Sequence, residues 1–306
     1  MEETEKRILI TGSNGFVGKH LVSALANKGY TNIFGLHRTP STEANVFIAD
    51  LSNKREVTEV VERVNPQIVF HLAANIKPSR EIDDLDEMIQ SNIGGTMNLL
   101  TALKKSNASV DSFVNVGSCE EYGWNEQPFT EDMPPSPVSI YSGTKAASAV
   151  LCKMFSNMFN MPIITVRPSL IYGPGQSERF FIMQAIKKML LNEEFNMTYG
   201  MQTRDFIYVD DFVEGLVAVS QLQDHTGQIF NISSGEEHSL RNIAEIIKSA
   251  TNSSSKLNFG AIPYRESEIM SYRCENSKIV EVTGWRPKTG MEKGIGKIVE
   301  DLKGIK

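Results

Sequence analysis

A tyrosine and a lysine four residues apart are the side chains of this sequence best suited to moving a proton. Tyr141 and Lys145 begin a segment whose apolar positions continue at Val150, Leu151 and Phe155, as in an amphipathic helix. Residues four apart lie side by side on a helix. An ammonium group beside a phenol favours the phenolate and lowers the phenol's pKa toward neutral pH. The pair therefore predicts a tyrosine that works as a general acid or base.

Ser118 offers a hydroxyl group to the same chemistry. It ends the apolar run Val114-Asn-Val-Gly-Ser118, which indicates a short strand. At the end of such a strand its hydroxyl can bind the carbonyl oxygen of a substrate. Tyr-x-x-x-Lys alone is common by chance, and the upstream serine makes chance a poor explanation. Because no Gly-x-Ser-x-Gly elbow surrounds Ser118, a hydrolase nucleophile is not predicted.

The beginning of the chain indicates a dinucleotide site. Arg7-Ile-Leu-Ile-Thr11 leads into Gly12-Ser-Asn-Gly15-Phe-Val-Gly18, a pattern of strand, tight turn and helix. Gly12 permits the turn, Gly15 lets backbone N–H groups approach a pyrophosphate, and Gly18 lets the helix pack on the strand. The first helical turn adds N–H donors and a positive dipole end. From this motif alone, an ordinary tight turn between strand and helix remains the alternative.

The second strand ends at His37 and Arg38, where an NAD site usually places an acid. A guanidinium can instead pair with the 2′-phosphate of NADP through two hydrogen bonds. NADPH is therefore the favoured cofactor, NAD is possible, and a solvated loop charge is the alternative reading of Arg38. The ends of the third and fourth strands add Asp50, Leu51, Ala73 and Ala74: Asp50 can accept from adenine, and the two alanines leave space for a ribose.

Strand and helix patterns alternate along the first half of the chain. Strands are expected near 7–11, 32–36, 45–49, 67–72, 111–116 and 162–166, and helices near 15–28, 53–64, 84–105, 140–160, 178–191, 210–222 and 239–250. The alternation predicts an α/β fold with a Rossmann-type doubly wound parallel sheet. We expect residues 1–170 to form the NAD(P)-binding domain and 171–306 mostly a smaller substrate-binding lobe. The chain should return to the sheet at 206–232, so that this lobe is discontinuous.

Composition excludes several classes of function. The 306 residues carry a net charge of −6 without a long basic run, which argues against nucleic-acid binding. No apolar run is as long as a membrane span, and no signal peptide is expected. Three cysteines fit a reducing cytosol, so a cytoplasmic protein is expected. Neither His-Glu-x-x-His nor paired Cys-x-x-Cys is present, and no metal is predicted.

These motifs occur in the order found in the extended short-chain dehydrogenase/reductases, and the chain resembles their nucleotide-sugar epimerase/dehydratase/reductase group. The resemblance covers nearly the whole chain. It is carried by Thr-Gly-x-x-Gly-x-x-Gly, Asp50-Leu51, His71-Leu-Ala-Ala74, Asn92-Ile-Gly-Gly-Thr96, Ser118…Tyr122-Gly123, Tyr141-x-x-x-Lys145 and Arg167-Pro…Tyr172-Gly-Pro-Gly175.

The resemblance implies roles for individual residues. Tyr141 would donate or accept the proton, Lys145 would activate it and bind the cofactor's ribose, and Ser118 would bind the substrate carbonyl. The implied cofactor-binding set also contains Asn14, Phe16, Val17, Leu72, Asn92 and Pro168, and the substrate-binding set contains Cys119. The family commonly forms homodimers through a four-helix bundle, which here would use the helices near 84–105 and 140–160.

Two arginines match those that bind the substrate diphosphate in the family. Arg204 lies in Gln202-Thr-Arg-Asp-Phe and Arg265 in Pro263-Tyr-Arg-Glu-Ser-Glu268. Two guanidinium groups from separate segments suit a diphosphate because each can bind oxygens bidentately. The alternatives are structural ion pairs, of Arg204 with Asp205 or Asp211 and of Arg265 with Glu268.

Reductases, dehydratases and epimerases of this group share the serine, tyrosine and lysine. Glu120 occupies the place of the base that removes the C5 proton in 4,6-dehydratases, whereas Cys119 replaces an acid and Leu170 replaces a common asparagine. Three features favour a reductase. Arg38 indicates NADPH, the chain is short for a dehydratase, and residues 258–270 and 284–287 resemble those of abequose-synthase-like enzymes. We therefore predict an NADPH-dependent 4-ketoreductase acting on a nucleotide-diphosphate 4-keto-6-deoxyhexose. The alternatives are a GDP-mannose-type 4,6-dehydratase, a 4-epimerase, and a non-catalytic NAD(P)-sensing protein.

Overall fold

Seven parallel strands form the main sheet in the described part of the chain. The computed structural model describes residues 3–77, 81–106, 108–265 and 268–304. In order of pairing the strands are β11 (Ile229–Ile232), β6 (Ile163–Pro168), β5 (Ser112–Val116), β4 (Ile68–His71), β1 (Ile8–Thr11), β2 (Ile33–His37) and β3 (Val46–Ile48). The order reverses at β1, from which the chain builds β2 and β3 on one side and β4, β5 and β6 on the other. The predicted doubly wound parallel sheet is confirmed.

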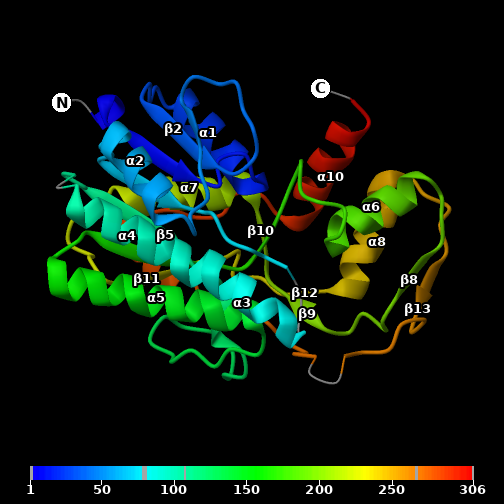
Figure 1. Cartoon of the computed structure of the whole chain (residues 1–306). Coiled ribbons are helices and arrows are strands. Elements are labelled where there is room, and N and C mark those ends of the chain that lie inside the picture. The colour runs from blue at the N-terminus through cyan, green and yellow to red at the C-terminus, as the bar shows by residue number, and fades with distance from the viewer. Residues whose placement is uncertain (1–2, 78–80, 107, 266–267, 305–306) are drawn as a thin grey trace.

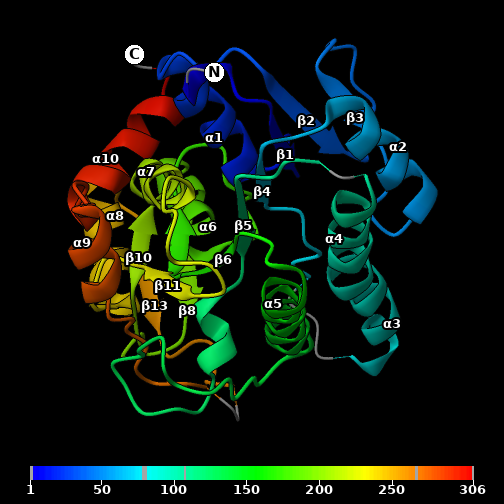
Figure 2. The same cartoon turned by 90° about the vertical axis from the view of Figure 1, so that its left-hand side faces the viewer.

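Helices cover both faces of this sheet, as Figure 2 shows from the side. One face packs against α1 (Phe16–Asn27), α7 (Val209–Ser220) and α9 (Ser277–Thr283), and the other against α2 (Lys54–Val64), α4 (Gly95–Lys105) and α5 (Ile140–Phe159). Successive side chains of a strand point to opposite faces. Ile8 and Ile10 accordingly join the first layer, and Leu9 joins the second. Burial on both faces explains the continuous apolar runs of the sequence.

A second group of elements packs around its own apolar cluster beyond the carboxyl ends of the strands (Figure 1). It contains α6 (Phe181–Leu190), α8 (Leu240–Thr251) and α10 (Met291–Leu302), with β8 (Phe195–Met197) paired to β13 (Leu257–Phe259). Two further pairs connect it to the main sheet: β7 (Leu170–Tyr172) with β10 (Phe206–Tyr208), and β9 (Thr203–Arg204) with β12 (His238–Ser239). We refer to this group as the second lobe.

Short helical turns complete the described chain: η1 (Glu3–Glu5), η2 (Ile82–Asp84), α3 (Leu85–Met88), η3 (Ile89–Gly94) and η4 (Cys119–Tyr122). The helix predicted over 84–105 is therefore divided, because η3 is a turn of π-helix between α3 and α4. Glu266 and Ser267, within the segment that resembles abequose-synthase-like enzymes, lie outside the described residues. Within the described ranges, no helix is both long and apolar enough to cross a bilayer.

The strands β1 to β6 and the helices α1, α2 and α5 to α8 lie within three residues of their predicted positions. The sequence analysis missed α9, α10 and the short strands of the second lobe. Helix α10 was missed because Gly294 and Gly296 lower its helix propensity. In the structure the helix is held by packing against Tyr172 and the apolar cluster of the second lobe. The division of the chain near residue 170 stays a prediction.

The two glycines of α10 give opposite expectations for stability. A Cβ at Gly294 would lie 2.1 Å from Oη of the buried Tyr172, whereas a Cβ at Gly296 would meet no atom within 4 Å. Gly294→Ala should lower the free energy of unfolding by about 1–3 kcal/mol through overpacking. Gly296→Ala should raise it by about 0.5–1 kcal/mol because alanine loses less entropy in a helix. Urea denaturation measures both; equal effects would contradict the packing described here.

Candidate active site

A cleft lies at the carboxyl ends of the parallel strands, facing the second lobe. Its volume is about 930 Å³. The predicted site residues that line it are Gly12, Asn14, Gly15, Phe16, Val17, Gly18, His37, Arg38, Asp50, Leu51, Leu72, Ala73, Ala74, Ser118, Cys119, Glu120, Tyr141, Lys145, Pro168, Arg204 and Arg265. The order of the strands reverses at this edge, which is where open α/β sheets bind their ligands.

The glycine-rich turn has the close packing that a pyrophosphate site requires. Gly12 has a φ of +72°, and a Cβ at Gly18 would lie 2.3 Å from the carbonyl oxygen of Gly12. The Gly15 amide donates to the Gly12 carbonyl oxygen at 2.9 Å, and Gly15 precedes α1 without a capping side chain. The first N–H groups of α1 are thus directed toward the cleft with no side chain over them. The residues present fit the diphosphate of a dinucleotide.

The adenosine end of the cleft carries opposite charges. Arg38 Nη1 lies 3.8 Å from Asp50 Oδ2, and the Arg38 side chain is 68% exposed. Although partial burial opposes the shift, hydrogen bonds from Ser52 and the charge of Arg38 lower the pKa of Asp50. An exposed pair at this distance is weak. Arg38 can therefore leave Asp50 for a stronger anion such as a phosphate.

Ser118 and Tyr141 both line the cleft. Ser118 is the N-cap of η4, where its Oγ accepts a hydrogen bond from the Glu120 amide at 3.1 Å. That bond occupies the oxygen and leaves the hydroxyl hydrogen to donate. The Tyr141 side chain comes from the first turn of α5 and lines the same cleft, and the Ser118 side chain acts to lower its pKa. The two hydroxyl groups can thus approach one carbonyl oxygen together.

The pKa of Tyr141 differs from the sequence-based expectation. Burial and the Glu120 carboxylate raise the pKa of the phenol, although the Ser118 side chain opposes the rise. The expected lowering by Lys145 is therefore not found among the groups of the chain itself. Burial also lowers the pKa of Lys145, whose ammonium forms no hydrogen bond with any described residue. A buried ammonium beside the cleft fits a ligand hydroxyl such as those of a ribose.

Asn92 is the predicted cofactor-binding residue that does not line the cleft. Its Oδ1 accepts from the Asn75 amide at 2.7 Å, and its Nδ2 donates to Thr144 Oγ1 at 2.9 Å. Asn92 thereby connects the loop after β4 to the turn of α5 that carries Lys145. In this structure its side chain supports the cleft wall, and a direct cofactor contact stays a prediction.

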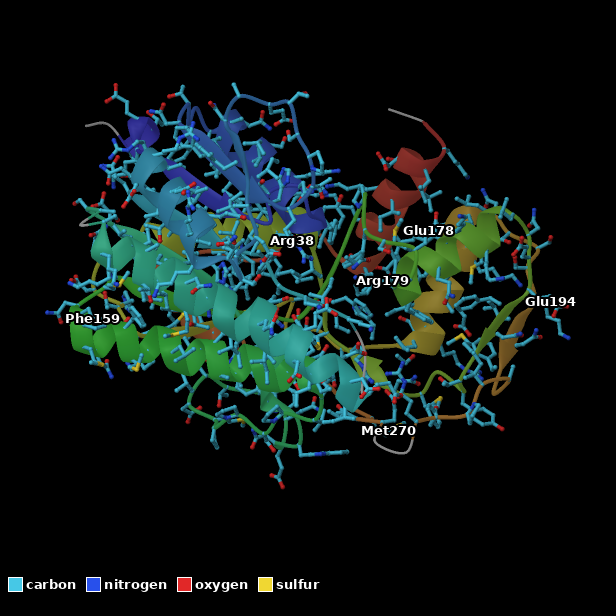
Figure 3. All side chains as sticks on the ribbon, viewed as in Figure 1. Arg38, Phe159, Glu178, Arg179, Glu194 and Met270 are labelled. Carbon is cyan, nitrogen blue, oxygen red and sulfur yellow. The ribbon has the colours of Figure 1, made fainter. Side chains whose placement is uncertain are left out.

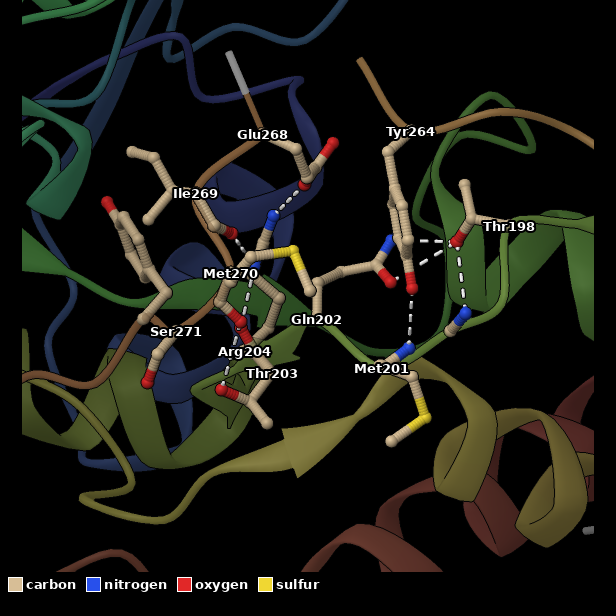
Figure 4. A network of polar contacts seen from close by, with 12 residues as sticks. Thr198, Met201, Gln202, Thr203, Arg204, Tyr264, Glu268, Ile269, Met270 and Ser271 are labelled. Atoms are coloured by element: carbon tan, nitrogen blue, oxygen red, sulfur yellow. Dashed lines mark hydrogen bonds and ion pairs between the residues drawn. The ribbon is translucent and has the colours of Figure 1, made fainter. Parts of the chain in front are cut away.

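Arg204 is held by groups of the second lobe, as Figure 4 shows. Its Nη1 donates to the carbonyl oxygens of Thr203 and Ile269, each at 2.7 Å, and its Nη2 pairs with Glu268. The alternative pairings expected from the sequence do not occur: Glu268 pairs with Arg204 and not with Arg265. Asp205 accepts from Ser234 and Gly235 instead. Arg265 is exposed on the cleft wall.

The sequence analysis missed Arg179 and the side chains behind Ser118. Arg179 precedes α6 and lines the cleft, and Figure 3 shows Arg38 and Arg179 in the region between the main sheet and the second lobe. The Gly-Pro-Gly turn before it was the available signal. Glu121 and Arg167 form a buried ion pair with Nε 2.8 Å from Oε2. An arginine within the apolar run of β6 was the sequence signal for that pair.

The chain matches the NAD dependent epimerase/dehydratase family over residues 8–233. It is 31% identical to a UDP-glucose 4-epimerase of Mycolicibacterium smegmatis, covering 96% of this chain and 97% of that protein. A CDP-abequose synthase of Salmonella muenchen is 29% identical (98% and 99% covered), and a dTDP-D-glucose 4,6-dehydratase of Bos taurus is 28% identical (96% and 88%). The structure of RMD from Pseudomonas aeruginosa complexed with NADPH has a TM-score of 0.85 at 25% identity, covering 98% of this chain and 99% of that one.

Proposed function

The chain belongs to the NAD-dependent epimerase/dehydratase family, and we propose that it is an NADPH-dependent 4-ketoreductase acting on a nucleotide-diphosphate 4-keto-6-deoxyhexose. One observation carries the choice of direction: Arg38 lines the cleft directly after β2, where an NAD site places an acid, which favours NADPH and so net reduction. A protonated phenol is the form that a ketone needs when it is reduced. Epimerases and 4,6-dehydratases must first take a proton from the C4 hydroxyl, which requires the tyrosinate.

In the proposed reaction each side chain of the cleft has one task. When bound, the reduced nicotinamide supplies hydride to C4. Ser118 donates a hydrogen bond to the C4 oxygen, and Tyr141 gives that oxygen its proton. Lys145 binds the ribose hydroxyls and supplies positive charge as the phenolate forms. The protein thus contributes orientation and electrostatics to chemistry that belongs to the cofactor.

The substrate's diphosphate is assigned to the arginines of the second lobe. Arg265 and Arg179 are exposed to the cleft, whereas Arg204 Nη2 already pairs with Glu268. A diphosphate that binds Arg204 must therefore replace this carboxylate or share the guanidinium with it. If the diphosphate replaces Glu268, the Arg204 guanidinium stays paired with an anion.

Two family reactions remain as alternatives, and each has an observation behind it. Glu120 lines the cleft beside Ser118, where a dehydratase needs a base for the C5 proton. A UDP-glucose 4-epimerase is among the relatives. Both reactions return the hydride within one turnover. Consumption of reduced cofactor therefore separates them from a reductase.

A panel of nucleotide 4-keto-6-deoxysugars and intact nucleotide hexoses tests the proposal, with NADPH absorbance as the readout. We expect a 4-keto sugar to be reduced with stoichiometric loss of NADPH. Tyr141→Phe should lower kcat by about 100-fold or more because the proton donor is missing, with cofactor affinity nearly unchanged. A 4-keto product formed from an intact hexose, without net NADPH loss, would make the enzyme a dehydratase.

Glu120→Gln distinguishes the two roles offered for that carboxylate. In a reductase its charge raises the pKa of Tyr141, so its removal should move the alkaline limb of the pH–rate profile to lower pH while activity near neutral pH is retained. The sign follows because the acid form of Tyr141 is then lost at a lower pH. In a dehydratase the glutamine cannot take the C5 proton, and turnover would be lost at every pH.

We propose NADPH rather than NADH as the cofactor because Arg38 directly follows β2, where an NAD site places an acid. Arg38→Ala should weaken NADPH binding by about 10- to 100-fold, the loss of charge-assisted hydrogen bonds, and leave NADH binding unchanged. Arg55→Ala is the control, since Arg55 is an exposed arginine of α2 that pairs with Glu59. Tighter binding of NADH than of NADPH by the unaltered protein would refute this assignment.

A homodimer through α5 and the α3–α4 helices is also proposed. Val150, Met154 and Met158 expose apolar side chains at four-residue spacing on α5. We expect light scattering to give twice the mass of one chain. Val150→Glu combined with Met158→Glu should reduce it to one chain, whereas Leu302→Glu, at an exposed position on α10, should not. A single-chain mass for the unaltered protein would overturn the proposal.

A further inference from the structure

We propose that Glu121 and Arg167 are positioning residues that hold Ser118 in its reactive orientation. The inference rests on the function proposed for Ser118 and Tyr141, and it applies to each of the family's reactions. Neither side chain reaches the cleft wall. Their effect on turnover must therefore be indirect, through the backbone of Ser118 and through the charge of Glu121.

Glu121 connects the serine to the sheet with both oxygens of its carboxylate. Oε1 accepts from the Ser118 amide at 2.8 Å, and Oε2 accepts from Arg167 Nε at 2.8 Å. The Glu121 side chain is 0% exposed and that of Arg167 is 3% exposed. The Ser118 amide is thus tied to β6 through one carboxylate, in addition to the capping bond that Ser118 Oγ accepts from Glu120.

Arg167 is itself fixed from several directions. It lies in β6, between β5 and β11 of the main sheet. Its guanidinium carbon lies 4.4 Å from the centre of the Tyr122 ring, a cation–π contact. The Tyr122 hydroxyl donates to Asn231 Oδ1 at 2.7 Å, and Asn231 belongs to β11. The serine therefore depends on two adjacent strands rather than on a loop of its own.

The charge of the pair has a second consequence for the site. A buried carboxylate is costly unless a cation compensates it, and Arg167 does so. The negative charge of Glu121 adds to that of Glu120 in raising the pKa of Tyr141. This charge acts on Tyr141 through space whether or not the pair orients Ser118. The kcat of variants that keep or lose an acceptor for the Ser118 amide therefore separates a positioning role from a structural one.

Gly117 offers a way to displace the carboxylate without removing a charge. A Cβ at Gly117 would lie 2.4 Å from Glu121 Oε1 and 3.1 Å from the Val166 carbonyl oxygen. Gly117→Ala should lower kcat by about 100-fold, as a displacement of about 1 Å at a reactive group does, while NADPH affinity and KM stay unchanged. Gly296→Ala is the matched glycine control and should leave kcat unchanged.

Glu121→Ala and Glu121→Gln complete the experiment, assayed with the keto sugar that the panel identifies. The glutamine keeps an acceptor for the Ser118 amide, so it should retain more kcat than the alanine. Both should move the alkaline limb of the pH–rate profile to lower pH, because each removes a negative charge near Tyr141. If Glu121→Ala does not fold, Gly117→Ala and Glu121→Gln still decide the matter.

Ser118→Ala separates this inference from the proposed function. If Ser118→Ala keeps the turnover of the unaltered protein, the function proposed for the serine fails, and this inference fails with it. If Ser118→Ala is inactive while Gly117→Ala and Glu121→Ala turn over at the unaltered rate, only the positioning role is overturned. Loss of kcat in all three, with NADPH affinity retained and partial activity in Glu121→Gln, supports it.

Discussion

The positive charge that Lys145 holds at the wall of the cleft acts on the groups packed around it. Desolvation of a cation is costly, and no described side chain offers this one a hydrogen bond. Burial and this charge lower the pKa of His71 to about 3, so the imidazole is neutral between Thr11 and Thr96. The structure thus places a cation at the cleft wall, one helical turn from Tyr141, and keeps His71 uncharged.

Two carboxylates, those of Glu120 and Glu121, place negative charge near Tyr141. Glu120 and Glu121 both raise the pKa of the phenol, but only Glu120 lines the cleft. Glu121 is turned inward, where it joins Ser118 to Arg167. Two adjacent glutamates in one 3₁₀ turn therefore have different surroundings, because the turn directs one toward the cleft and the other toward the sheet.

The second lobe holds Arg204 of the cleft wall in a fixed set of contacts. Its arginine at position 204 is held by Glu268 and by the carbonyl oxygens of Thr203 and Ile269. The positive charge of Arg204 is therefore already compensated by a carboxylate of the protein. The serine, tyrosine and lysine are common to reductases, dehydratases and epimerases. Differences between those reactions must therefore arise from side chains such as Glu120 and from the groups that orient the sugar.

The sequence by itself determined the parallel sheet and the glycine-rich turn after β1, and all of its predicted site residues except Asn92 line the cleft. These features depend on local patterns: apolar runs buried on both faces, three glycines in one turn, and a tyrosine and lysine one helical turn apart. Tertiary structure alone decided the state of Tyr141, the pairing of Arg204 with Glu268 and the inward role of Asn92. It also decided the joining of Glu121 to Arg167, 46 residues away. Each of these depends on burial or on a partner distant in the chain, and neither quantity can be read from spacing along it.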